Sequence, residues 1–125
     1  MVKTMAVLFG VVFLVIGALG FVPAVTKDDM LLGIFHVNAA HNVVHLLSGA
    51  AALFCGMTSF GAARNYFRIF GVVYAAVAVL GFLNPGEHTM LLGLISNNTA
   101  DTWLHVAIAA VSLILGFMPA SADTA

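Results

Sequence analysis

Residues 5–22 of the chain read MAVLFGVVFLVIGALGFV and contain no charged side chain. A helix rises 1.5 Å per residue, so about 20 apolar residues cross the roughly 30 Å hydrocarbon core of a bilayer. Three more stretches without Asp, Glu, Lys or Arg, each of at least 18 residues, follow at 30–63, 69–86 and 102–122. The sequence therefore predicts an all-α integral membrane protein with four transmembrane helices.

The composition supports this prediction. Of 125 residues, 62% are hydrophobic and 7% are charged, whereas soluble domains carry about 25% charged residues. The formal net charge is −1 and the Lys and Arg residues are scattered, so the chain lacks the basic stripe that binds nucleic acid. We predict the lipid bilayer, not a nucleic acid, as the main partner. The single cysteine, Cys55, excludes an intrachain disulfide.

The few charged residues predict an orientation. Lys3 precedes the first apolar stretch, and Arg64 and Arg68 separate the second from the third. The loops after the first and third stretches carry no excess of Lys or Arg. Because cytoplasmic loops are enriched in Lys and Arg, both termini are expected in the cytoplasm.

An internal repeat divides the chain into halves. Residues 30–45, MLLGIFHVNAAHNVVH, align with 90–105, MLLGLISNNTADTWLH, and when the alignment is extended to 56 and 116, 10 of 27 positions are identical. The segment FGVV also occurs twice, at 9–12 and 70–73. Such self-similarity is typical of duplicated units. We predict a single domain over 1–125, built from two repeated helical hairpins of the same topology at about 4–58 and 66–118.

Polar residues indicate where two of the helices begin. Asn38 and Asn98 are good N-cap residues, and Asp101 completes a capping box with Asn98. The second helix is then expected at about 39–57 and the fourth at about 99–118. The preceding segments, 30–37 and 90–97, are expected to be short interfacial pieces at the membrane surface.

Four ionisable residues inside the predicted helices are candidates for a binding site. His41 and His45 are four residues apart, as are Asp101 and His105, so each pair shares one helix face. If the second and fourth helices face each other, the four side chains converge. Imidazole and carboxylate together suit Zn, Cu, Ni or Fe, and His45 with His105 alone could ligate a haem or a chlorophyll-type pigment.

A structural interpretation of the same residues stays open. Asp101 is explained by capping and His41 by a polar helix entrance. His45 and His105 are explained by hydrogen bonds to Ser48, Asn42 or a backbone carbonyl. His36 and His88 are expected to be solvated interfacial histidines.

Two motifs carry a resemblance to a known family: HVNAAHNVVHLLSG at 36–49 and NTADTWLH at 98–105. At these motifs, and over nearly its whole length, the chain resembles a family of bacterial membrane proteins catalogued as domain of unknown function 4383. The resemblance implies a four-helix membrane protein of bacteria, including cyanobacteria and actinobacteria, without an assigned activity. It implies the inner (plasma) membrane or a thylakoid membrane as the location.

Three functions are compatible with these observations. No nucleophile–base set, phosphate loop or dinucleotide fingerprint is found, so we predict a non-enzymatic protein. The leading hypothesis is an accessory or scaffold subunit whose small-residue helix faces pack against other membrane subunits, of a photosynthetic or respiratory complex for example, or against another copy. The second is a membrane protein that binds a metal, haem or pigment through its histidines. The third is a small transporter or channel that works as an oligomer.

Overall fold

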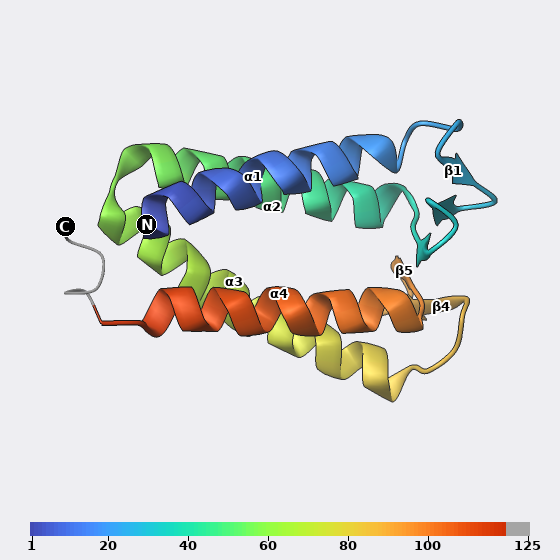
Figure 1. The fold of residues 1–125 in the computed structure, drawn as a ribbon. Helices are drawn as coiled ribbons and strands as arrows, with labels where there is room; N and C mark the ends of the chain where they lie inside the picture. The colour runs from blue at the N-terminus through green and yellow to red at the C-terminus, as the bar shows by residue number, and fades with distance from the viewer. Residues whose placement is uncertain (120–125) are drawn as a thin grey trace.

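The structure, a computed structural model, describes residues 1–119 as four long helices with short strands between them (Figure 1). The helices are α1 (Val2–Leu19), α2 (Ala39–Thr58), α3 (Phe60–Leu83) and α4 (Thr99–Phe117). Each of them is long and apolar enough to cross a membrane. Large apolar side chains are exposed on all four, among them Leu8, Phe54, Val72 and Ile114. The prediction of four helices that can span a membrane is confirmed, and they fit a multi-pass membrane protein.

Glycines allow the helices to pack closely in pairs, α1 against α2 and α3 against α4. A Cβ atom added at Gly10 of α1 would lie 2.8 Å from the backbone oxygen of Gly49 on α2. One added at Gly116 of α4 would lie 2.8 Å from the backbone nitrogen of Arg68 on α3. Small residues serve this purpose in membranes, where van der Waals packing joins helices.

The turn between α2 and α3 is shorter than expected. Ser59 alone separates the two helices, and its hydroxyl accepts a hydrogen bond from the Ala62 N–H at 3.0 Å. Arg64 and Arg68, which the sequence suggested for a loop, therefore lie within α3. Their Nε atoms both donate to Gly116 O, at 3.2 and 2.6 Å. Because the last carbonyls of a helix have no partner within it, the two arginines complete the end of α4.

The other two connections contain short antiparallel strands, which the all-α prediction did not include. Between α1 and α2, strands β1 (Thr26–Lys27), β2 (Met30–Leu31) and β3 (Phe35–His36) form a small sheet. Between α3 and α4, strands β4 (Thr89–Leu91) and β5 (Ile95–Asn97) form a hairpin. Strands β2 and β3 lie within the expected interfacial segment 30–37, and β4 and β5 lie almost entirely within 90–97, whereas β1 precedes the first of them.

Each Leu-Leu-Gly motif forms the turn of a hairpin. Leu32 and Gly33 have φ of 54° and 70°, and Leu92 and Gly93 have φ of 55° and 67°. In both hairpins the next residue donates its N–H to the carbonyl three positions earlier, at 3.0 Å. Two consecutive positive φ angles define a type I′ turn, which matches the twist of paired strands and favours glycine.

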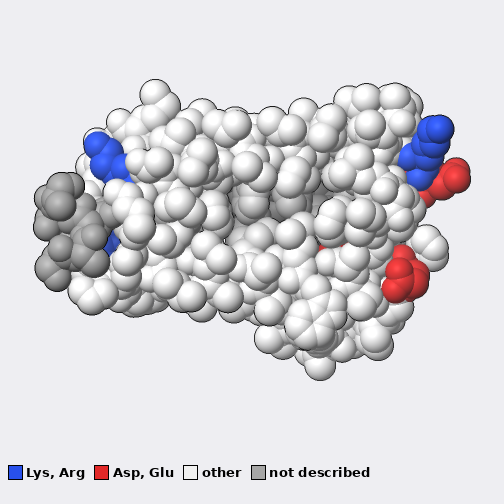
Figure 2. All heavy atoms as spheres, in the orientation of Figure 1, with Lys and Arg blue, Asp and Glu red and all other residues white. Residues whose placement is uncertain are grey.

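The molecule has two distinct ends. The N-terminus and the α2–α3 turn lie at one end, called the turn end below, and all strands lie at the other, called the strand end (Figure 1). Charged side chains gather at both ends, and the band between them is almost free of charge (Figure 2). A core cluster at the turn end is formed by Val2, Ala6, Ala52, Ala63, Tyr66, Phe67 and Leu115.

Candidate metal-binding site

Asparagine caps fix the first turns of α2 and α4 at the strand end. The Asn38 side chain accepts a hydrogen bond from the His41 N–H at 2.9 Å. Asn98 accepts one from the Asp101 N–H at 2.9 Å, and Asp101 Oδ2 accepts one from the Asn98 N–H at 3.1 Å. These bonds satisfy backbone donors that have no partner within their helices.

The same asparagines join the two halves of the molecule. Asn38 Nδ2 donates to Leu94 O, and Asn98 Nδ2 donates to Ile34 O, both at 2.9 Å. Each bond runs from the start of one helix to the hairpin turn that precedes the other. The starts of α2 and α4 are thereby held at a fixed separation.

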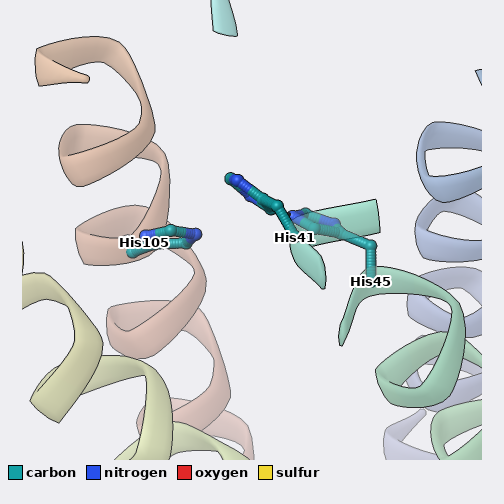
Figure 3. A group of neighbouring side chains, drawn as sticks. All are labelled: His41, His45 and His105. Carbon is teal, nitrogen blue, oxygen red and sulfur yellow. The ribbon is translucent and has the colours of Figure 1, made fainter. Parts of the chain in front are cut away.

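Three histidines meet between these helices. His41 and His45 extend from α2 toward His105 on α4 (Figure 3). One ring nitrogen of each lies within 4.8 Å of the other two, and all three side chains are buried. The ring centroids are 4.9 Å apart for His41 and His45, 5.8 Å for His41 and His105, and 6.4 Å for His45 and His105.

Hydrogen bonding determines which nitrogen His41 can offer to a ligand. Its Nδ1 lies 2.7 Å from Ser96 O, and a carbonyl only accepts, so Nδ1 carries the proton and Nε2 keeps its lone pair. That Nε2 lies 3.1 Å from Nε2 of His45. Two nitrogens bound to one tetrahedral zinc ion at about 2.05 Å are about 3.3 Å apart. The spacing fits two ligands of a single ion, and Ser96 O is the outer partner that metal-binding histidines usually have.

The other two histidines each have a nitrogen without a partner. Nδ1 of His45 and Nδ1 of His105 are buried and make no hydrogen bond. Ser48, one of the three partners suggested for them, instead accepts hydrogen bonds from two tyrosines. Its Oγ accepts from Tyr74 at 2.8 Å, and its backbone O accepts from Tyr66 at 3.1 Å. A buried polar atom without a partner costs about 1–3 kcal/mol. A metal ion bound to Nε2 of His45 would leave Nδ1 of that ring without a partner, whereas one bound to Nδ1 of His105 would remove the cost there.

Asp101, the fourth candidate ligand, is not part of this histidine group. One of its oxygens is engaged in the capping box described above. Its side chain nevertheless lines the same cavity, of about 130 Å³, as His41 and His45. The structure thus brings three of the four predicted ligands together and leaves the carboxylate beside them.

Sequence reasoning missed the tyrosines near the site. Tyr74 packs against His105 with ring centroids 5.7 Å apart, and both Tyr66 and Tyr74 are buried. They lie on one face of α3 with Phe70, since the three aromatic residues are four positions apart. That spacing is the signal from which a buried aromatic stripe could have been predicted.

Residues 3–118 match a family described as a domain of unknown function (DUF4383). The chain belongs to this family. The predicted resemblance is confirmed, and the match spans all four helices of this DUF4383 member. No curated protein and no solved structure matches the chain. The function of the protein must therefore be argued from its own residues.

Three small cavities adjoin the histidines. Besides the one with Asp101, a cavity of about 110 Å³ between α2 and α3 is lined by all three histidines. One of about 230 Å³ between α1 and α4 touches His45, and Figure 2 shows the surface hollowed between these helices. Pockets for drug-sized ligands measure about 300–1,000 Å³. Each cavity has room for water or an ion, but is small for a larger ligand.

Proposed function

We propose that this protein binds a transition-metal ion within the membrane through His41, His45 and His105. One observation carries the proposal: three buried imidazoles from two helices have ring nitrogens within 4.8 Å of one another. Imidazole is the ligand type that suits Zn, Cu, Fe and Ni. Ionisable residues inside a membrane are costly, and usually mark a functional site.

The geometry favours a bare ion over a tetrapyrrole. A haem or chlorophyll-type pigment held by His45 and His105 would need a slot for a flat macrocycle between them. The third imidazole, His41, lies beside both rings, and the adjoining cavities measure only about 110–230 Å³. An ion needs none of this space, because it binds among the nitrogens themselves.

For a single copy of the chain, ion binding is also favoured over ion transport. The histidines lie toward the strand end, one or two turns into α2 and α4. Across the described residues, the turn end is filled by the core cluster, in which Phe67 and Ala52 are fully buried. An ion that leaves the histidines toward the turn end would therefore meet this mainly apolar cluster. A transporter or channel would require an oligomer.

The repeat fits the position of the site. We infer two equivalent hairpins because each half makes the same hydrogen bond to the other, from Asn38 to Leu94 and from Asn98 to Ile34. The two donors are 60 residues apart in sequence, and so are the two acceptors. His45 and His105 are also 60 residues apart. The metal would then lie near a pseudo-twofold axis along the membrane normal.

We propose a bacterial plasma or thylakoid membrane as the location, and the charges support a cytoplasmic turn end. Lys3, Arg64 and Arg68 are near the turn end, whereas acidic residues predominate at the strand end. An accessory role beside other subunits is compatible with a metal site, and exposed apolar side chains such as Phe54 and Leu83 would suit contact with a subunit as well as with lipid.

Metal titration of the purified protein in lipid nanodiscs tests the proposal. The wild type should show one tight Zn²⁺ site per chain in isothermal titration calorimetry. His45→Ala and His105→Ala should each weaken that binding by at least about 100-fold, since loss of an outer partner alone costs 10–100-fold. Ser112→Ala, which removes a buried hydroxyl of α4 without a hydrogen-bond partner, is the control. Equal affinity in all four proteins would contradict the proposal.

A further inference from the structure

Two histidines outside the candidate site lie against each other at the strand end. The rings of His36, on β3, and His88, just before β4, are 4.9 Å apart and perpendicular. His88 is exposed and His36 is half-buried. They come from the two different connections, so the fold brings together residues 52 positions apart in sequence. His36 and His88 lie at the surface, as expected. The expectation did not include the contact between their rings.

His36 is oriented in the same way as His41. Its Nδ1 lies 3.4 Å from Asn97 O, and because a carbonyl only accepts, Nδ1 donates and Nε2 keeps its lone pair. The neighbouring carbonyl of β5, Ser96 O, fixes His41 in the same state. Two successive carbonyls of β5 thus hold the proton on Nδ1 of two histidines, His36 at the surface and His41 in the buried group.

The charges around this end favour cations. Asp28, Asp29 and Glu87 belong to the two connections of the strand end, where Lys27 is the only Lys or Arg. Carboxylates gathered at one end of a protein raise the local concentration of cations and their rate of association. The turn end, with Lys3, Arg64 and Arg68, has the opposite sign.

From these observations we infer that His36 and His88 form an outer capture site for a divalent transition-metal ion, which then passes to His41, His45 and His105. The inference rests on the proposed function for the role of the inner group. The outer site has two imidazole ligands and is open to water, so it binds weakly and exchanges its ion quickly. The inner site has three buried ligands and retains the ion. Strand β5 connects the two sites, because its Asn97 carbonyl contacts His36 and its Ser96 carbonyl contacts His41.

Loading kinetics test this route. Co²⁺ is added to metal-free protein in nanodiscs, and its visible absorption is followed by stopped flow. His36→Ala with His88→Ala should slow loading of the inner site by about tenfold, in keeping with the effect of local charge and ligands on association rates. The equilibrium affinity should change by less than about threefold, because the inner ligands are intact. Thr89→Ala is the control, since it removes the neighbouring hydrogen bond to Asn97 O but leaves both imidazoles. Unchanged loading in the double variant would overturn the inference, and so would an equal loss of affinity.

A second variant separates this inference from the proposed function. With His45→Ala and His105→Ala combined, the inner site is disabled, and one weak Zn²⁺ site should remain that disappears when His36 and His88 are also replaced. If the inner-site variant binds no Zn²⁺ while the wild type does, the capture site is wrong and the inner site stands. If the wild type shows only the weak site, the capture site stands and the proposed inner site is wrong.

Discussion

At the scale of single residues, the hydrogen bond from His41 to Ser96 O determines the chemistry of the site. It holds the proton on Nδ1 and leaves Nε2 available to a metal. The sequence predicted that His41 and His45 share a helix face, because a spacing of four places them there. It could not predict Ser96, since the acceptor is a backbone carbonyl on a strand, and its side chain gives no signal.

The tautomer of His41 is the first prediction. Nitrogen-15 NMR of the histidine side chains should show His41 protonated at Nδ1 in the metal-free protein, because the Ser96 carbonyl accepts that proton. The same tautomer should persist with Zn²⁺ bound, and the Nε2 resonance should shift on binding. A proton on Nε2 of His41 in the metal-free protein would contradict the assigned hydrogen bond.

At the scale of helices and strands, the sequence predicted the spans better than the connections. The four helices were predicted from the length of the apolar stretches. Helices α2 and α4 begin directly after their N-cap residues, Asn38 and Asn98. The hairpin strands were missed because the apolar Leu-Leu-Gly motifs suggested contact with the membrane surface. Their turns depend on positive φ at a leucine, which residue preference does not suggest. The start of α3 was missed because arginines were assigned to a loop.

Close packing of α1 on α2 gives the second prediction. Gly10→Ala should lower stability by about 1–3 kcal/mol, the usual cost of overpacking. The added Cβ would meet the Leu53 N and Gly49 O backbone atoms at 2.7 and 2.8 Å, which cannot move aside easily. Denaturation in mixed micelles followed by circular dichroism measures the difference. Gly61→Ala, with its nearest atom 4.0 Å away, is the control and should change stability little. Equal effects of both substitutions would show that the packing is looser than described.

The histidine group gives the third prediction, because its ligands come from both helix pairs. A metal bound by His45 of α2 and His105 of α4 joins the two pairs directly. Zn²⁺ at 100 times its dissociation constant should stabilise the fold by about 2.7 kcal/mol, seen as a higher thermal midpoint. His105→Ala should abolish this gain, because only ligands of α2 remain. An equal rise in midpoint for the variant would place the stabilising ion elsewhere.

At the scale of the whole molecule, the distribution of charge predicts how the chain lies in the membrane. The uncharged band in Figure 2 is bounded by basic residues at the turn end and by mainly acidic residues at the strand end. Because cytoplasmic segments carry the excess of Lys and Arg, the turn end should face the cytoplasm. Family membership leaves this orientation open, so it requires its own experiment.

Cysteine labelling provides that experiment and is the fourth prediction. In a Cys55→Ser background, Glu87→Cys at the strand end should react with a membrane-impermeant maleimide in intact cells. Gly61→Cys at the turn end should react only after the cells are permeabilised. Both sites are exposed in the fold. The reverse pattern would invert the orientation, and labelling of both from one side would contradict a membrane-spanning arrangement.

The central claim is that three buried histidines bind one metal ion, and X-ray absorption spectroscopy of the Zn²⁺-loaded protein tests it most directly. We predict three imidazole nitrogens at about 2.0–2.1 Å in the first coordination shell, with the multiple scattering typical of histidine rings. The imidazole contribution should fall in His41→Ala. Protein that retains no Zn²⁺ after desalting, or a shell of oxygen atoms without imidazole scattering, would contradict the claim.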